Sequence, residues 1–259
     1  MAARDEPTRE PETADGPWSA LRGLTAARIG LRRVGASLAT APMLEFKLAH
    51  ARARDAVHEP LDSARLAADL VRTGKTVVGV ASQALDRQTY LMRPDLGRAL
   101  SESSTAALRS VRSDHDVVFV VADGLSAGAV QRHAPPVLDA ALAALLEVWQ
   151  VAPLVIASHA RVAIGDAVAE ALGAACVVIL IGERPGLSAP DSMGAYLTWR
   201  PHGRTTDADR NCISNIRPGG IGYEEAASRL VWLLNAMRAR QTSGVMLKDD
   251  FSGRSIVAP

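Results

Sequence analysis

The feature that most constrains the fold is an unbroken apolar run at residues 175–181, followed directly by a charged turn. The run has the sequence Ala-Cys-Val-Val-Ile-Leu-Ile, and residues 182–186 are Gly-Glu-Arg-Pro-Gly. A largely β-branched run without polar interruption predicts a strand buried on both faces, in the middle of a parallel sheet. Open α/β sheets bind ligands at the carboxyl ends of their strands. The turn that holds Glu183 and Arg184 is therefore predicted to lie at a ligand-binding edge.

Strands and helices alternate along most of the chain. Apolar runs predict further strands at 75–80, 116–122 and 153–157, and the spacing of apolar residues predicts helices at 166–172 and 223–240. Strands and helices in alternation, with short connections, predict parallel strands joined by crossovers. A hydrophobic content of 48% in 259 residues is enough to fill such a core. We therefore expect an α/β fold, an open parallel sheet flanked by helices in a Rossmann-like arrangement.

The amino-terminal part of the chain has a different character. Residues 1–20 are polar and rich in Pro, Glu and Asp, which predicts a disordered tail. Residues 21–65 have a helical pattern, with Thr40 placed to cap a helix and Pro42 suited to its first turn. The polar face of this helix is either a solvated surface or part of an arm that grips another subunit. The expected organisation is a tail (1–20), a helical arm at a subunit interface (21–65) and an α/β domain (66–259).

Composition excludes several classes of protein. A net charge of +1 provides no long-range field to hold nucleic acid or an anionic membrane. Cys176 and Cys212 are the only cysteines, so they cannot form a disulfide framework, and no Cys/His spacing is typical of a metal site. No run is long and apolar enough to span a bilayer, and the amino terminus lacks the apolar segment of a secretion signal. We expect a cytosolic protein whose last segment, after Gly244, is mobile.

Three positions at predicted strand ends carry candidate binding groups. Asp123 follows the strand at 116–122, where it binds a ribose or a phosphate-bound metal or caps the next helix. No G-x-G-x-x-G or G-x-x-x-x-G-K-[ST] motif is present, which argues against a dinucleotide or NTPase site. Arg161 follows the next strand, so we expect it in the same crevice as Glu183. Of the adjacent residues Glu183 and Arg184, one either faces a ligand while the other holds a neighbouring loop, or the two form buried ion pairs with residues such as Arg161 or Asp191.

Residues 210–217 form a second segment rich in polar side chains, with the sequence Arg-Asn-Cys-Ile-Ser-Asn-Ile-Arg. Its amide, thiol and hydroxyl groups offer directional hydrogen bonds to a ligand that itself carries amides. Cys212 as a nucleophile would need a neighbouring base and a positive field. The segment contains no histidine, and His202 is the nearest candidate base in the sequence. We therefore favour a contact or packing role for Cys212.

Several motifs occur in a fixed order that matches one known family. They include Ala-Asp-Gly-Leu-Ser-Ala at 122–127, Arg-Val-Ala-Ile-Gly-Asp at 161–166 and Ile-Gly-Glu-Arg-Pro-Gly-Leu at 181–187. Further matching segments lie at 27–31, 50–57, 210–216 and 243–245. Together they resemble the small (light) subunit of ethanolamine ammonia-lyase over nearly the whole chain after its polar start.

The resemblance implies a cobalamin-binding subunit that pairs with a large TIM-barrel subunit. That family, a group of carbon–nitrogen lyases, uses adenosylcobalamin to turn ethanolamine into acetaldehyde and ammonia by radical elimination. Substrate and radical are held by the large subunit, so the resemblance implies no catalytic residue in this chain. The family's corrinoid contacts fall on Val162, Glu183 and Cys212 of this sequence. This chain would then bury one side of the corrinoid and exclude water and oxygen from the radicals.

The sequence also allows other functions. Cobalamin proteins in which a histidine replaces the nucleotide base carry Asp-x-His-x-x-Gly, and residues 113–117 do not match it. The resemblance therefore suggests that dimethylbenzimidazole stays on cobalt. The chain could instead be a stand-alone corrinoid carrier, or a thiol hydrolase that uses Cys212. Location inside a bacterial microcompartment is a further option that the sequence leaves open.

Overall fold

The fold is seen in a computed structural model that describes residues 18–145 and 148–252. The chain divides into two units between Arg52 and Ala53, and each is described here by itself. Most of the predicted disordered tail, residues 1–17, lies outside the described residues.

The first unit combines short elements with the start of a long helix. It contains α1 (Ser19–Arg22), a small hairpin of β1 (Arg33–Val34) and β2 (Ser37–Leu38), and the first part of α2 (Thr40–His58). The helix begins at Thr40, so Thr40 is its first residue and not the predicted cap, and Pro42 lies in the first turn as expected. The hairpin occupies a stretch in which the sequence pattern predicted helix.

The second unit is built on one six-stranded sheet, in the order β3-β5-β4-β6-β7-β8. Its strands are β3 (Val77–Ala81), β4 (His115–Ala122), β5 (Leu154–Ser158), β6 (Ala174–Gly182), β7 (Met193–Trp199) and β8 (Arg210–Ile216). The first four in spatial order are parallel, and β7 and β8 extend the sheet as antiparallel strands. The predicted α/β class with an open sheet is confirmed. The antiparallel extension was not predicted.

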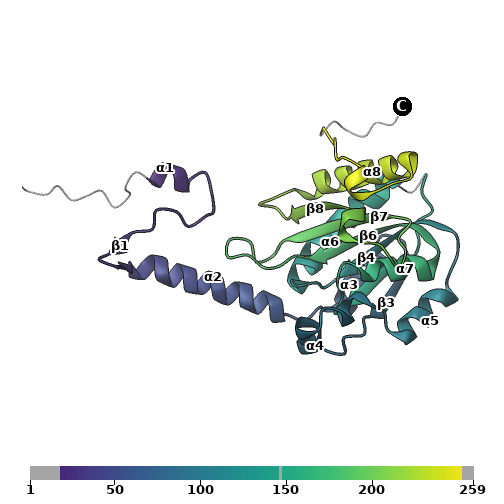
Figure 1. Cartoon of the computed structure of the whole chain (residues 1–259), viewed down its shortest axis with the longest axis horizontal. Coiled ribbons are helices and arrows are strands. Elements are labelled where there is room, and N and C mark those ends of the chain that lie inside the picture. Colours follow the sequence, from purple (N-terminus) through teal and green to yellow (C-terminus); the bar gives the residue numbers. More distant parts are fainter. Residues whose placement is uncertain (1–17, 146–147, 253–259) are drawn as a thin grey trace, which may run out of the picture. The chain divides into compact units, whose positions relative to one another are not determined.

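Helices cover the two faces of this sheet unequally (Figure 1). One face packs against α3 (Ser63–Val71), α6 (Ala127–Leu145) and α8 (Tyr223–Arg240), and the other packs against α5 (Glu102–Ser110) and α7 (Ile164–Leu172). The shorter elements are α4 (Arg87–Met92) and the 3-10 turns η1 (Leu96–Arg98), η2 (Asp207–Asp209) and η3 (Gly244–Met246). The helices that pack most extensively against β7 and β8 are α6 and α8, which lie on the same face.

Strand β6 occupies the interior position that its sequence predicted. Val178 and Leu180 join the core under α6 and α8, whereas Val177, Ile179 and Ile181 join the core under α7, all at most 5% exposed. This two-sided burial is the reason the run contains no polar residue. The turn that follows β6 therefore leaves from the middle of the sheet.

The carboxyl-terminal segment differs from the prediction. Leu247 is buried, and its carbonyl accepts a hydrogen bond from Asn211 Nδ2 at 2.8 Å. Arg229 and Asp249 form an ion pair. The expectation of mobility directly after Gly244 was wrong, because these contacts bind the segment to α8 and β8. Residues 253–259 lie outside the described chain.

No helix among the described residues combines the length and apolar character that a membrane crossing requires.

Candidate functional site

The carboxyl ends of β4 and β5 are joined by one buried carboxylate, and the end of β6 is joined to β4 by a backbone hydrogen bond. Asp123 accepts hydrogen bonds at 2.9 Å from the backbone amides of Gly124, His159 and Ala160. Arg87 Nη1 lies 3.4 Å from the same carboxylate. Gly182 O accepts from the Leu125 amide at 2.9 Å, which joins the end of β6 to the end of β4.

Asp123 therefore holds a neighbouring loop in place. The sequence suggested a ligand contact or a cap on the next helix, but its partners are the first two residues of the β5–α7 loop. That loop continues through Arg161 and Val162 into α7. We conclude that Asp123 fixes the path of a segment that carries a predicted contact.

Arg161 is packed against an aromatic ring at the start of the same loop. Its guanidinium carbon lies 4.4 Å from the centre of the Tyr90 ring, a cation–π arrangement. Its backbone amide donates to Gly97 O at 2.8 Å. Tyr90 is fully buried, so the base of the loop is held on both its backbone and its side chain.

Glu183, the first residue after β6, spans to the far end of β8. Both carboxylate oxygens accept from the Asn215 amide, at 3.1 and 3.2 Å. Asn215 has a positive φ of 59° at an irregular point in the β7–β8 pairing. Glu183 forms no ion pair with Arg161, and Asp191 pairs with Arg132 at 3.3 Å instead of with Arg184. Arg184, next to Glu183, is exposed.

The sheet face beside Glu183 is open where β7 and β8 extend the sheet. Cys212 and Ser214 of β8 are exposed, and Cys212 lies directly opposite Tyr196 of β7. A Cβ atom on Gly194 would lie 3.0 Å from Glu183 Oε1 and 3.3 Å from Tyr196 Cε2. Glu183, Tyr196 and Cys212 thus share one face, and Gly194 leaves room between the first two.

The local electrostatics disfavour a nucleophilic thiol. Burial raises the pKa of Cys212, and the nearby Glu183 carboxylate raises this pKa further, against the opposing effect of a hydrogen bond with Tyr196. Burial also raises the pKa of the Tyr196 hydroxyl. Nucleophilic cysteines need the opposite shift, toward the thiolate. Cys212 is therefore a neutral thiol near pH 7, which fits the predicted contact role.

A buried ion pair connects β8 to the helix after Val162. Arg210 Nη1 and Nη2 lie 2.7 and 2.6 Å from the two carboxylate oxygens of Asp166 in α7. The two side chains are 3% and 13% exposed. Arg210 also donates to Thr198 of β7 at 3.0 Å. This pair locks the start of α7 against the same sheet extension that carries Cys212.

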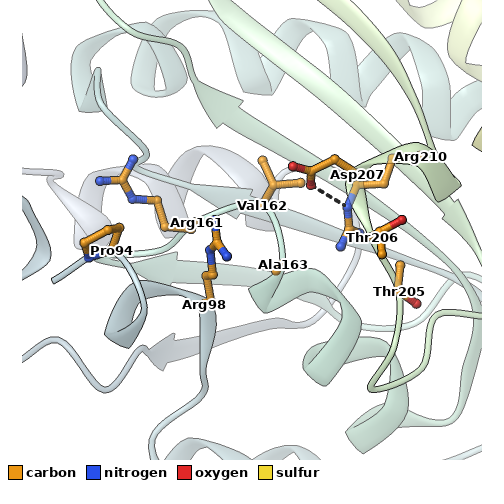
Figure 2. A pocket seen from close by; sticks show the side chains of 9 residues that line it. All are labelled: Pro94, Arg98, Arg161, Val162, Ala163, Thr205, Thr206, Asp207 and Arg210. Carbon is orange, nitrogen blue, oxygen red and sulfur yellow. Dashed lines mark ion pairs between the residues drawn. The ribbon is translucent and has the colours of Figure 1, made fainter.

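A pocket of about 410 Å³ opens between the Val162 loop and the start of β8 (Figure 2). Its lining residues are Pro94, Arg98, Arg161, Val162, Ala163, Thr205, Thr206, Asp207 and Arg210. Val162 and Arg210 face the same pocket, and Arg210 precedes Cys212 by two residues on one strand. The three predicted contacts therefore lie along a continuous stretch from the α7 loop over β8 to the end of β6.

The sequence analysis missed two members of this region. Tyr196 lies in β7, whose residues Met193, Ala195 and Leu197 are buried on the opposite face. That alternation with period two was the signal for a strand. Arg98 lies in the 3-10 turn η1, and no local pattern distinguishes it from a solvated arginine.

Comparison with known proteins gives one consistent result. Residues 15–248 match the family model described as ethanolamine ammonia-lyase light chain (EutC). The chain is 52% identical to the ethanolamine ammonia-lyase small subunit of Azotobacter vinelandii over 93% of this chain and 91% of that protein. It is 53% identical to the small subunit of Xanthomonas campestris pv. campestris, over 94% and 90%. A third small subunit, from Ralstonia nicotianae, is 51% identical over 95% and 93%. The chain therefore belongs to the ethanolamine ammonia-lyase light-chain family.

Proposed function

We propose that this chain binds one side of adenosylcobalamin at an interface with a large TIM-barrel subunit that holds ethanolamine. The observation that carries the proposal is the open face of β7 and β8. Glu183, Tyr196 and Cys212 lie together on it, at the ligand-binding edge of the sheet. The complex would convert ethanolamine into acetaldehyde and ammonia. The name small subunit, shared by the relatives, implies a larger partner.

The groups on this face suit a flat ligand with an amide-rich rim. The Glu183 carboxylate accepts one backbone amide and has lone pairs left for further donors. Cys212 offers a neutral, exposed thiol. Among the described residues, the backbone amides of Val162 and Ala163 have no acceptor. Carboxylate, thiol and free amides together can receive both the N–H and the C=O groups of a corrin rim.

When bound, the cofactor supplies the radical chemistry that starts the elimination of ammonia. The residues of this chain would hold the corrin rim and shield it from water. The open strands would form one wall of that enclosure. No acid–base role falls on Glu183, whose carboxylate is engaged with Asn215.

The test is acetaldehyde release from ethanolamine with adenosylcobalamin, for this chain alone and mixed with its cognate large subunit. Acetaldehyde release by the mixture, with none by this chain alone, would support the proposal. Corrinoid binding by this chain alone, with no activity in the mixture, would favour the stand-alone carrier instead. Full activity of Cys212→Ser in the mixture would exclude a thiol hydrolase.

Replacing Glu183 with glutamine is expected to weaken cobalamin binding by the assembled complex about tenfold. A hydrogen bond to a charged group contributes roughly 1.5–3 kcal/mol, and 1.4 kcal/mol is a factor of ten. The measurement is the dissociation constant from a spectral titration with cyanocobalamin. Glu170→Gln makes the same chemical change at an exposed position of α7 and should leave the constant unchanged. An equal effect of the two variants would contradict the assignment of Glu183.

We further propose that the predicted helical arm contacts the large subunit. Large apolar side chains are exposed along the first unit and the start of α2: Leu24, Val34, Leu38, Met43, Leu44, Phe46 and Leu48. Leu44 and Leu48 are 56% and 51% exposed, four residues apart on one helix face. An apolar surface of this kind marks an interaction site.

The double substitution Leu44→Glu and Leu48→Glu is expected to abolish co-purification with the large subunit. Burying one leucine contributes about 1.5–3 kcal/mol, so losing two weakens association at least roughly 100-fold. Lys47→Glu, an exposed change between them, is the matched control. Intact assembly of the double variant would refute the role of the arm.

A further inference from the structure

The loop after β5 is fastened at both polar backbone groups of its first two residues. Asp123 accepts the N–H groups of His159 and Ala160, one on each carboxylate oxygen. The two carbonyls are held from other elements. Ser82 Oγ donates to His159 O at 2.7 Å, and Tyr90 Oη donates to Ala160 O at 3.2 Å. This part of the loop therefore has little conformational freedom.

The fastened loop holds a strained residue. His159 has a positive φ of 52°, a conformation that residues other than glycine rarely adopt, and its ring Nδ1 lies 3.2 Å from Ala84 O. Such a conformation persists only where its surroundings enforce it, and it is found preferentially at binding sites and switches. Three residues later the same loop presents Val162. The contacts around His159 therefore set the position from which Val162 is offered to a ligand.

Arg87, the first residue of α4, connects this loop to two other segments. Its Nε donates to Val57 O at 2.8 Å, a carbonyl of the last turn of α2 that lacks a partner within its own helix. Its Nη1 donates to Gly124 O at 2.8 Å and lies 3.4 Å from Asp123 Oδ2. The guanidinium carbon lies 4.8 Å from the centre of the Tyr90 ring, one turn along α4. One side chain, only 17% exposed, thus joins the end of α2, the turn after β4 and the carboxylate that holds the loop.

The charge of Arg87 matters because of where Asp123 lies. Asp123 is 3% exposed, and burial raises the pKa of its carboxyl. The amides of Ala160 and His159 oppose this effect on the pKa, and so does Arg87. An ionised carboxylate is the stronger acceptor for backbone amides. Arg87 therefore favours the form of Asp123 that holds the loop most firmly.

We propose that Arg87 is a positioning residue for the cofactor, which acts through Asp123 on the loop that carries Val162 and does not itself contact the cofactor. The inference rests on the proposed function, because Val162 is a cofactor contact only if this chain binds cobalamin. A loop that adopts its binding conformation for one tenth of the time lowers the apparent affinity tenfold. Loss of Arg87 therefore weakens cofactor binding and leaves the chemistry in the large subunit unchanged.

The test is Arg87→Met in the complete complex with its large subunit. Methionine keeps an apolar stem against Tyr90 and removes every N–H donor of the side chain. In the cofactor-free complex, hydrogen exchange in peptides that span residues 158–163 is expected to become at least roughly tenfold faster. The dissociation constant of cyanocobalamin and the KM for adenosylcobalamin are expected to rise about tenfold. The kcat at saturating cofactor and the KM for ethanolamine should change less than about twofold, because the substrate is bound elsewhere.

Three further variants separate positioning from a general loss of structure. Arg87→Lys keeps the positive charge beside Asp123 and should restore cofactor affinity to within about threefold of wild type. Tyr90→Phe removes only the hydroxyl that holds Ala160 O, so it should also speed exchange in the same peptides, and it tests the clamp even if Arg87→Met fails to fold. Arg93→Met, at the end of the same helix, removes an exposed ion pair with Asp95 and should change neither exchange nor affinity.

The outcomes distinguish this inference from the proposed function. Weaker cofactor binding by Arg87→Met with unchanged exchange would mean that Arg87 contacts the cofactor directly, which overturns the positioning role. Faster exchange with unchanged affinity would overturn it as well, because the loop would then not determine cofactor binding. A wild-type complex that binds no cobalamin would instead overturn the proposed function. The exchange measurement would still decide, in that case, whether Arg87 holds the loop.

Discussion

Replacing Gly182 with alanine is expected to lower the midpoint of thermal unfolding by about 6 to 12 °C. A Cβ at this position would lie 2.1 Å from Ser126 O and 2.6 Å from Asp123 O. Both are backbone atoms, so no side chain can rotate to make room. Overpacking of this kind costs about 3 kcal/mol or more, and each kcal/mol shifts the midpoint of a chain this size by roughly 2–4 °C.

Gly79→Ala supplies the matched control for this change. Gly79 also lies in a strand of the same sheet, but a Cβ there would meet nothing within 4 Å. Alanine is the better residue in a strand interior, so the control should match or slightly exceed the wild-type midpoint. Equal midpoints for the two variants would show that the junction of β4 and β6 can relax. Because Glu183 follows Gly182, the first variant should also weaken corrinoid binding.

Asp166→Asn is expected to destabilise the fold by about 3–5 kcal/mol, or roughly 6 to 20 °C in the unfolding midpoint. The change leaves the Arg210 guanidinium buried without its bidentate carboxylate, and Arg210 is only 3% exposed. The remaining carboxylate near Arg210, Asp207, lies 3.5 Å away and is 95% exposed, so solvent screens it and it offsets little of the desolvation cost. The free energy of unfolding is measured by urea denaturation of the purified chain, and the midpoint by thermal denaturation.

A second pair of variants separates the ion pair from a general loss of packing. The double substitution Asp166→Leu with Arg210→Met removes both charges and should be much more stable than Asp166→Asn. Asp95→Asn, in the exposed Arg93–Asp95 pair, should have little effect because solvent screens that pair. If Asp166→Asn behaved like Asp95→Asn, the buried pair would not be what fastens α7 to β8.

Local sequence pattern was sufficient to predict the parallel part of the sheet. The strands at 116–122 and 175–181 appear within one residue at each end as β4 and β6, and the last helix has the predicted bounds. Gly173, the residue directly after the helix predicted at 166–172, ends α7 with a left-handed φ of 79°. These predictions succeeded because burial on both faces, helical periodicity and a left-handed stop are all encoded by neighbouring residues.

The candidate site was predicted less completely. Cys212 and Glu183 were singled out by their local chemistry and by family resemblance, yet their neighbour Tyr196 was not. Arg210 was noted only as the first residue of the polar segment 210–217. Its actual partner Asp166 lies 44 residues away, and nothing in either segment alone indicates the pair.

The sequence by itself determined the class of fold and the family of the chain. It also identified the strand ends that carry the polar and charged candidate residues. Each of these depends on short-range pattern or on the order of motifs. Only the tertiary structure decided that β7 and β8 extend the sheet without helices over the site face, and that Arg210 is held by Asp166. It also decided that Arg98 and Arg161 share a pocket. Pairing of distant segments depends on the packing of the whole core, so local propensity cannot specify it.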